Sequence, residues 1–280
     1  MNIELRHLRY FIAVAEELHF GKAAERLNIS QPPLSQQIQA LESEIGARLL
    51  ERTNRSVSLT PAGQMFLKGS YQIMAQVKAV ATRASRMEKG ELGEISIGFT
   101  STTPFMHLVT LSLRQFRENY PEVGIHMHQM NTKQQISPLL TGHIDLGIMR
   151  NTVLPDNLHH QLLFREPFIL AVYEGHPLLE YKETGVNIQL LSLAGITPTI
   201  AQEAGEAMTI LGLVAAGLGI SIVTKSFTRM KVDGVHYLHF ANSNAFSEVW
   251  LVSHNKRTIP AAANRLTQLL LKNILEDQKS

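Results

Sequence analysis

The strongest constraint in this chain is a pair of short helical patterns joined by a tight turn near the N-terminus. Residues 22–27 are typical of a short helix, and Asn28 after them tolerates the left-handed backbone that a tight turn requires. Ser30 can cap the next helix, whose first turn holds prolines at 32–33, where a missing amide hydrogen costs nothing. The apolar positions of this second helix share one face; they are Leu34, Ile38, Leu41 and Ile45. The pattern predicts a helix-turn-helix.

The segments on either side extend this motif into a small domain. An amphipathic helix is expected over 5–17, ahead of the pair, and Gly46 ends the second helix of the pair. Two short runs, 48–52 and 56–59, flank the polar turn 53–55 and predict a small hairpin, or wing.

A long helix is expected directly after the wing. Thr60 and Pro61 are a typical N-cap and first helical residue, and 62–89 holds no further proline. An apolar stripe runs along it through Phe66, Ile73, Val77 and Val80. A helix of this length extends about 42 Å. A helix that long without a partner in its own domain usually pairs with its counterpart in a second subunit.

The composition excludes several classes of function. The chain of 280 residues has no cysteine, which rules out disulfides, thiolate-bound zinc and a cysteine nucleophile. Neither a signal peptide nor a run of about 20 apolar residues is present, so we expect a cytoplasmic protein with no membrane contact. Residues 1–90 carry 12 Lys and Arg against 8 Asp and Glu, a modestly basic head that suits nucleic acid.

The remainder of the chain alternates between strand and helix patterns, which predicts an open α/β sheet. The first part reads strand, helix, strand, helix, strand over 94–99, 108–119, 123–130, 134–140 and 144–149. A second lobe is expected from about 163, with a strand at 168–173, a helix at 208–216 and a strand at 220–224. A strand at 248–252 and a helix at 260–276 end the chain.

Residues 20–63, FGKAAERLNISQPPLSQQIQALESEIGARLLERTNRSVSLTPAG, closely resemble the LysR-type family of bacterial transcription regulators. The resemblance implies an all-α winged helix-turn-helix domain at 1–60, a linker and dimerisation helix at 61–90, and an α/β effector domain at 91–280. That last domain is expected to have the two lobes of a type 2 periplasmic-binding-protein fold. Lobe I would comprise about 91–162 and 253–280, and lobe II about 163–252.

The start of the second helix of the motif holds the candidates for reading DNA. Only this end of a recognition helix reaches base edges, and glutamine can bond bidentately to adenine. The candidate residues here are Ser30, Gln31, Pro32, Ser35, Gln36 and Gln39. Lys22, Arg52 and Arg55 are candidates for the phosphate backbone, with solvated surface charge as the alternative for each. Several family members carry arginine where this chain has Gln36, which leaves the base preference there open.

The effector site is expected at the carboxyl ends of the first-lobe strands. Thr100, Ser101 and Thr102 form a hydroxyl-rich turn into a helix, and a helix N-terminus favours anions, notably carboxylates. The alternative is that they only cap the helix. The resemblance places Thr102 and Thr132 in the effector cleft, with Glu203 and Ala204 on the opposing wall. Arg150 either binds an acidic effector or pairs with a neighbouring acid.

One segment departs from the family pattern. Residues 188–200 must connect two strands, yet a strand-helix-strand crossover needs at least about 10–12 residues for the crossover alone. Family members carry a further strand and helix here, so either the second lobe is shortened or a segment is missing from this sequence.

Rival functions have weaker support. The pairs His126 with His128 and His159 with His160 suggest a metal site, but no acidic partner lies at ligand spacing, so we expect neither metal nor cofactor. No phosphate-binding glycine loop or nucleophile elbow indicates an enzyme. The expected partners are double-stranded DNA, a small anionic effector molecule, and further copies of the chain in a homodimer or a homotetramer. RNA polymerase is a further candidate. A constitutive or architectural DNA-binding protein is the alternative.

Overall fold

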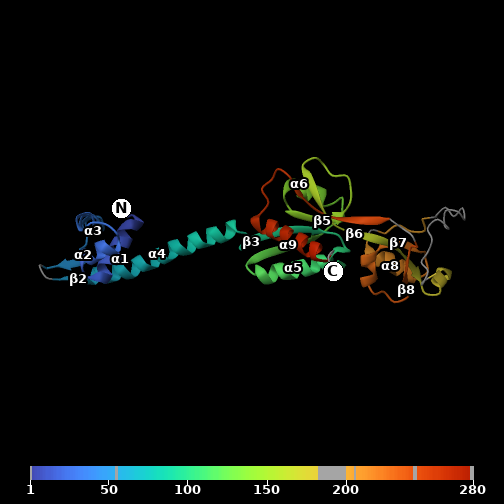
Figure 1. Cartoon of the computed structure of the whole chain (residues 1–280), viewed down its shortest axis with the longest axis horizontal. Helices are drawn as coiled ribbons and strands as arrows, with labels where there is room; N and C mark the ends of the chain where they lie inside the picture. The colour runs from blue at the N-terminus through green and yellow to red at the C-terminus, as the bar shows by residue number, and fades with distance from the viewer. Residues whose placement is uncertain (1, 54–55, 182–199, 205, 242–244, 278–280) are drawn as a thin grey trace. The chain divides into compact units, whose positions relative to one another are not determined.

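The computed structural model of the chain describes residues 2–53, 56–181, 200–204, 206–241 and 245–277. It divides into two compact units, Met1–Ser85 and Arg86–Ser280 (Figure 1). The first unit holds the helix-turn-helix and most of the long helix, and the second holds the α/β sheet. Each unit is described by itself below.

Unit 1 contains the elements expected from the sequence. They are α1 (Leu5–Glu17), α2 (Phe20–Arg26), α3 (Gln31–Ile45), the hairpin strands β1 (Leu50–Arg52) and β2 (Val57–Leu59), and α4 (Pro61–Glu88). The two strands are antiparallel, with Leu50 opposite Leu59. The helices enclose one apolar cluster, in which Phe11, Leu34 and Ile38 are fully buried. Burying each such side chain stabilises the unit by about 1.5–3 kcal/mol.

Two residues with left-handed backbone shape the helix-turn-helix. Asn28 follows α2 with φ 54°, and Gly46 ends α3 with φ 74°, as the sequence predicted for both positions. Ser30 occupies the N-cap position of α3, but its side chain makes no capping hydrogen bond. The predicted position of Ser30 at the N-cap is therefore confirmed, whereas its exposed side chain does not supply the expected capping hydrogen bond.

The start of α4 is fixed against the hairpin. The Thr60 hydroxyl accepts the Gly63 amide hydrogen at 2.9 Å and donates to the Arg48 carbonyl at 2.7 Å. A Cβ atom at Gly63 would lie 2.0 Å from the Leu49 carbonyl oxygen, so only glycine allows this approach. These contacts join the wing to the long helix.

Unit 2 is built on a sheet of seven described strands. Its elements are β3 (Gly93–Phe99), the 3₁₀ turn η1 (Thr103–Phe105), α5 (His107–Asn119), β4 (Val123–Gln129), α6 (Ile136–Thr141), β5 (Leu146–Arg150), β6 (Leu158–Tyr173), η2 (Pro177–Tyr181), α8 (Ala207–Ala215), β7 (Ser221–Thr224), η3 (Lys225–Arg229), β8 (Val235–His239), β9 (Phe246–His254) and α9 (Ala261–Asp277). The strand order is β4-β3-β5-β9-β6-β7, with β8 also paired to β6.

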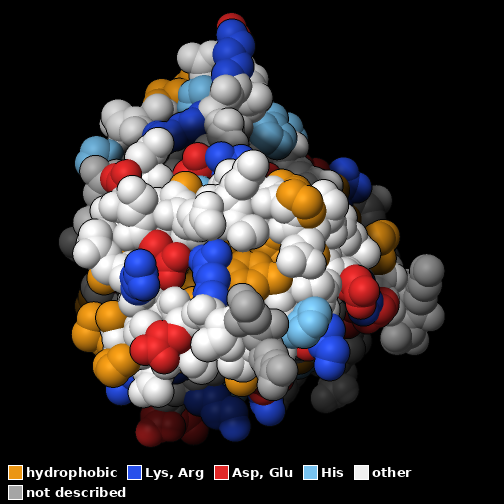
Figure 2. All heavy atoms as spheres, turned by 90° about the vertical axis from the view of Figure 1, so that its left-hand side faces the viewer, with side chains coloured by type: hydrophobic (Ala, Val, Ile, Leu, Met, Phe, Trp, Pro, Cys, Tyr) orange, Lys and Arg blue, Asp and Glu red, His pale blue; other side chains and the backbone are white. Residues whose placement is uncertain are grey.

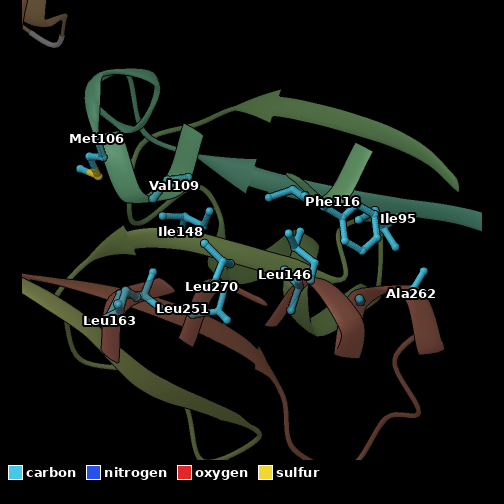
Figure 3. Packing of buried hydrophobic residues seen from close by; sticks show 14 of the residues in the cluster. Ile95, Met106, Val109, Phe116, Leu146, Ile148, Leu163, Leu251, Ala262 and Leu270 are labelled. Atoms are coloured by element: carbon cyan, nitrogen blue, oxygen red, sulfur yellow. The ribbon is translucent and has the colours of Figure 1, made fainter. Parts of the chain in front are cut away.

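The long strand β6 joins the two lobes of this sheet. Its first half, from Leu158 to Pro167, pairs with β9, and its second half pairs with β7 and β8. A register shift between Leu162 and Phe164 marks a β-bulge in the first half. In the first lobe, α5 and α9 pack on the sheet around Phe116, Leu146 and Leu270 (Figure 3). In the second lobe, α8 and β7 pack on β6 around Ile169 and Leu211.

Three features of unit 2 differ from the sequence expectations. The strand expected at 168–173 begins at Leu158, and β8 was not expected. The turn at 100–102 leads first into the short 3₁₀ turn η1, which was not expected, whereas α5 begins at His107, close to the helix expected at 108–119; neither has a side-chain cap. The shortened connection at 188–200 lies almost entirely outside the described residues.

Candidate functional site

The N-terminal part of α3 presents polar side chains to solvent. Gln31, Gln36 and Gln39 are exposed, as are Ser30 and Pro32, whereas Ser35 is half-buried. On the opposite face Leu34 and Ile38 are fully buried in the core of unit 1. Within the described residues, no hydrogen bond or ion pair holds the three glutamine side chains. The base-reading candidates therefore lie together and free on one face of one helix.

The basic candidates differ in their surroundings. Lys22 is exposed at the start of α2. Arg52 instead pairs with Glu42 at 3.0 Å, and its guanidinium lies over the Phe20 ring, 4.8 Å from the centroid. Glu42 also accepts the backbone N–H groups of Leu49 and Leu50, so it ties α3 to the wing. Arg55 lies outside the described residues.

Charges of both signs are mixed on the side of unit 1 that faces the viewer in Figure 2. Lys and Arg side chains lie among Asp and Glu side chains there, rather than forming one basic patch.

One residue that positions α3 was missed by the sequence reasoning. His7 on α1 is buried, and its Nδ1 accepts the Glu4 backbone N–H at 3.1 Å. The neutral ring therefore carries its proton on Nε2, which donates to Gln37 Oε1 on α3 at 2.9 Å. Gln37 is half-buried, and this hydrogen bond joins α1 to α3. A polar residue inside an apolar helical stripe was the available signal.

The exposed face of α4 carries apolar side chains. Ile73, Val77 and Val80 are 43%, 39% and 68% exposed, whereas Phe66 packs edge-on against Phe11 in the core of unit 1. The stripe expected from the sequence thus has two parts, one buried within unit 1 and one open. An open apolar helix face of this kind is suited to a helical partner.

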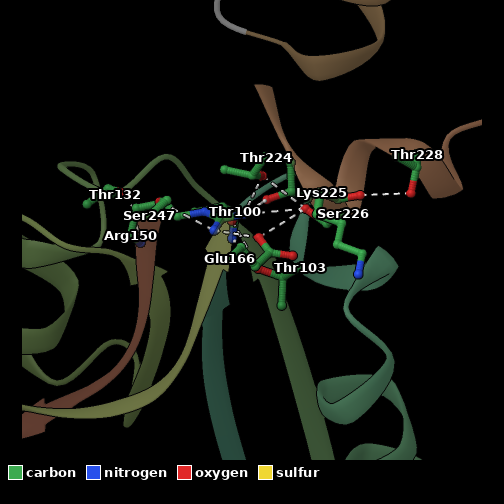
Figure 4. A network of polar contacts seen from close by, with 11 residues as sticks. Thr100, Thr103, Thr132, Arg150, Glu166, Thr224, Lys225, Ser226, Thr228 and Ser247 are labelled. Atoms are coloured by element: carbon green, nitrogen blue, oxygen red, sulfur yellow. Dashed lines mark hydrogen bonds and ion pairs between the residues drawn. The ribbon is translucent and has the colours of Figure 1, made fainter. Parts of the chain in front are cut away.

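In unit 2, Arg150 is the centre of a polar network that joins the two lobes (Figure 4). Its Nη1 lies 2.6 Å from Glu166 Oε2, an ion pair between β5 and β6. The side chains of these residues are only 19% and 11% exposed. Hydroxyl groups from both lobes surround the guanidinium; they belong to Thr102, Thr224, Ser226 and Ser247, at 3.0–3.4 Å. Of the two alternatives for Arg150, the structure shows pairing with a neighbouring acid.

The first-lobe threonines lie in the same network. The Thr102 hydroxyl is 3.3 Å from that of Thr100, and Thr132 Oγ1 accepts the Arg150 backbone N–H at 3.3 Å. Ser101 is half-buried in the same turn. The structure thus brings four of the expected effector residues together, Thr100, Thr102, Thr132 and Arg150.

Glu203 and Ala204 lie elsewhere. They line a hollow of about 880 Å³ beside α8 and β7, together with residues such as Leu218 and Ile222. A further contact across the lobes is made by Glu206, whose carboxylate accepts from the Gln129 amide at 3.4 Å. Glu166 and Glu206 were both missed by the sequence reasoning.

The histidine pairs form no metal site among the described residues, where no group of three or more potential ligands is placed to hold an ion. His160 stacks on the Trp250 ring at 3.7 Å, and His159 Nε2 lies 3.3 Å from the Ser253 hydroxyl. His126 lies 3.5 Å from Glu94.

Two family models match nearly the whole chain. Residues 5–64 match the helix-turn-helix of bacterial regulatory proteins of the lysR family, and residues 88–274 match the LysR substrate binding domain. The chain belongs to the LysR family of transcriptional regulators. It is a DNA-binding regulator with a substrate-binding domain, and members of this family are regulators rather than enzymes. The resemblance identified in the sequence is confirmed.

Relatives align over almost their full length. The regulator YnfL of Escherichia coli, itself uncharacterized, is 50% identical over 294 residues, which cover 96% of this chain and 99% of YnfL. AlsR of Bacillus subtilis is 37% identical and covers 91% of each chain.

A solved relative was determined together with DNA. Full-length CbnR complexed with its target DNA superposes with a TM-score of 0.78 at 28% identity, covering 97% of this chain and all of that one. The same fold and the same order of domains support the winged helix-turn-helix and two-lobed architecture. In the part of this LysR chain that the structure describes, no helix is long and apolar enough to cross a membrane.

Proposed function

We propose that this LysR regulator binds a discrete operator through the start of α3, and that a small-molecule effector bound between the lobes of unit 2 changes that binding. The residues that would contact DNA are Lys22, Ser30, Gln31, Pro32, Ser35, Gln36, Gln39, Arg52 and Arg55. The glutamines would read bases, and the basic residues would neutralise phosphates. The observation that supports this half is the row of exposed, unbonded glutamines at the start of α3.

The effector half is supported by the network at Arg150. Thr100, Ser101, Thr102, Thr132 and Arg150 gather where the parallel strands β3 and β5 end, which is where open α/β sheets bind ligands. Thr224 and Ser226 reach the same point from the second lobe. A ligand there would touch both lobes and alter their contact. Glu203 and Ala204, beside α8, remain candidates for a wall of this site.

The assembly we propose is a homodimer through the open apolar face of α4, with a pair of dimers as the tetramer. Two recognition helices would then lie one or more DNA turns apart, as the two halves of a palindromic operator require. RNA polymerase is the further partner expected of a regulator bound at a promoter.

The decisive experiment combines footprinting with ligand titration. Discrete protection of promoter DNA, changed in extent or position by a small molecule, is the expected result. Protection that no small molecule alters would favour the second candidate function, a constitutive regulator. The observation that favours this second function is that the polar groups around Arg150 are already bonded to one another. Light scattering that finds only monomers at micromolar concentration would contradict the dimer.

A further inference from the structure

We infer that His19, directly before α2, is a further DNA-binding residue, whose neutral imidazole donates a hydrogen bond to a phosphate oxygen of the operator. This inference rests on the DNA-binding half of the function proposed above and adds a contact to it. The sequence analysis drew its phosphate candidates from lysine and arginine alone and so did not include this residue.

The ring of His19 has one nitrogen engaged and one free. The residue is exposed, and its Nδ1 accepts the Lys22 backbone N–H at 3.2 Å. A ring nitrogen that accepts a hydrogen bond carries no hydrogen, so the neutral ring has its proton on Nε2. Within the described residues, Nε2 has no partner. The ring therefore presents one free N–H donor to solvent.

The backbone on both sides holds His19 at this surface. Leu18 before it has a left-handed backbone with φ 48°, which is uncommon for a residue other than glycine. Phe20 after it is buried in the core of unit 1, and the Arg52 guanidinium lies over the Phe20 ring. His19 is thus placed between a turn and a buried anchor, with its side chain facing solvent.

Gly21 allows the ring to lie next to a base-reading candidate. A Cβ atom at Gly21 would lie 3.0 Å from His19 Cε1 and 3.7 Å from Gln31 Oε1, so the two side chains flank the same small space. Gln31 is the first residue of α3. In a helix-turn-helix the second helix enters the major groove, and the helix before it crosses the DNA backbone. A donor on the first helix beside the start of the second is therefore placed for a phosphate.

His19 and Lys22 should contribute to binding in different ways. An ammonium group that neutralises a phosphate releases a counterion, so its contribution weakens as salt rises. A neutral imidazole adds a hydrogen bond to a charged acceptor and releases no counterion. Loss of the His19 contact should therefore lower affinity without changing the salt dependence.

The test separates this contact from the capping of α2. His19→Asn keeps a side-chain oxygen that can accept the Lys22 N–H, since asparagine is a favoured N-cap residue, but it removes the donor at Nε2. The full-length variant should bind a duplex that the wild type selects from random sequences about tenfold more weakly. Its unfolding midpoint, followed by circular dichroism, should equal that of the wild type. His19→Ala should lower both affinity and midpoint.

The control is His239→Asn, the same change at an exposed histidine of unit 2, which should bind as the wild type does. Unchanged affinity in His19→Asn, or a loss that follows a loss of stability, overturns the inference. A salt slope lowered by about 1 in His19→Asn would also overturn it, because a charged ring would then make the contact.

Phosphate replacement tests the contact itself. Each phosphate of the selected duplex is replaced in turn by an uncharged methylphosphonate. At one position the replacement should weaken the wild type but add little to the loss in His19→Asn, because that contact is already gone. Losses that add fully at every phosphate would show that His19 acts only through the fold, and would overturn the inference.

Failure of this inference is distinguishable from failure of the proposed function. If Gln31→Ala leaves base preference unchanged while one phosphate still depends on His19, then base reading by Gln31 fails and the role of His19 stands. If Gln31→Ala relaxes base preference while His19→Asn binds as the wild type, then base reading stands and the role of His19 falls.

Discussion

The two polar surfaces of this regulator differ in the exposure and the hydrogen bonding of their side chains. On α3, Gln31, Gln36 and Gln39 are exposed and hold no partner among the described residues. In unit 2, the side chains around Arg150 are largely buried and bonded to one another. The first surface can meet a ligand as it stands, whereas the second must exchange its own contacts for those of a ligand.

This difference separates recognition from response. A surface whose donors and acceptors face water binds without rearranging the domain, so changes there alter affinity and sequence preference. A cleft whose groups satisfy each other across two lobes couples any bound ligand to the contact between those lobes. DNA recognition is therefore a property of exposed residues, and sensing a property of the bonds that join the lobes.

The largest effect is expected from removing the buried arginine. Arg150→Ala leaves Glu166 buried without its counter-ion and should lower the free energy of unfolding of unit 2 by about 3–5 kcal/mol. Arg165→Ala breaks a pair with Glu248 between β6 and β9 of the same sheet, but Arg165 is 61% exposed. That change should cost at most about 1 kcal/mol. Denaturation followed by fluorescence of Trp250, the one tryptophan of the chain, reports on unit 2. Equal losses of the free energy of unfolding in the two variants would mean that burial does not make the Arg150 ion pair more important for stability than the Arg165 ion pair.

A smaller and different effect is expected on α3. Gln31→Ala should relax base preference at one operator position by about 1–3 kcal/mol, because its amide is free to pair with a base. Stability should stay unchanged, since the side chain has no partner to lose. Binding measured against operators with single base changes checks this, with Gln72→Ala on exposed α4 as the control. Weakening by the same factor on every sequence would assign Gln31 to the phosphates instead.

The phosphate candidates should change the salt dependence of binding. Lys22→Ala and Arg55→Ala are each expected to lower the slope of log affinity against log salt by about 1. Arg52→Ala should lower it less, because Arg52 starts from an ion pair with Glu42. Fluorescence anisotropy at several salt concentrations measures the slope, and Lys78→Ala on α4 is the control. If the slope in Arg52→Ala falls by as much as in Lys22→Ala, then DNA displaces Glu42 from Arg52 in the wild type.

The sequence predicted what depends on local backbone chemistry. Asn28 and Gly46 end their helices because the left-handed backbone there suits these residue types, and α4 starts at Pro61 as expected. The alternation in 93–150 likewise predicted the first-lobe strands, because a buried strand is recognised from its own residues.

What the sequence did not predict depends on pairing between distant segments. Glu166 lies 16 positions after Arg150 with no pattern to link them, and β6 places it opposite Ser247 only through the register of the sheet. The length of β6 and the presence of β8 follow from the same register. Ser30 shows the reverse case, since a local capping rule was satisfied by residue type and yet not used.

The smallest expected effect on stability concerns an exposed cluster in unit 1. Like the Arg150 network, this cluster contains a glutamate, an arginine and a hydroxyl group. The Tyr71 hydroxyl on α4 donates to Glu16 on α1 and lowers the pKa of that carboxyl, and Arg26 on α2 adds to the effect. A depressed folded-state pKa stabilises the protein above the unfolded value of about 4.3 and loses that contribution as pH falls through the folded pKa.

Tyr71→Phe should therefore raise the pKa of Glu16, as measured by NMR titration of its carboxyl carbon. The stability of the variant should fall slightly below that of the wild type near pH 7, and the difference should shrink as the pH falls below about 4.3 and vanish below the folded-state pKa of Glu16. Tyr10→Phe, on α1 and without a carboxylate partner among the described contacts, is the control. Because water screens the exposed cluster, the loss should be far smaller than for Arg150→Ala. A loss of similar size would show that burial is not what makes the cleft network strong.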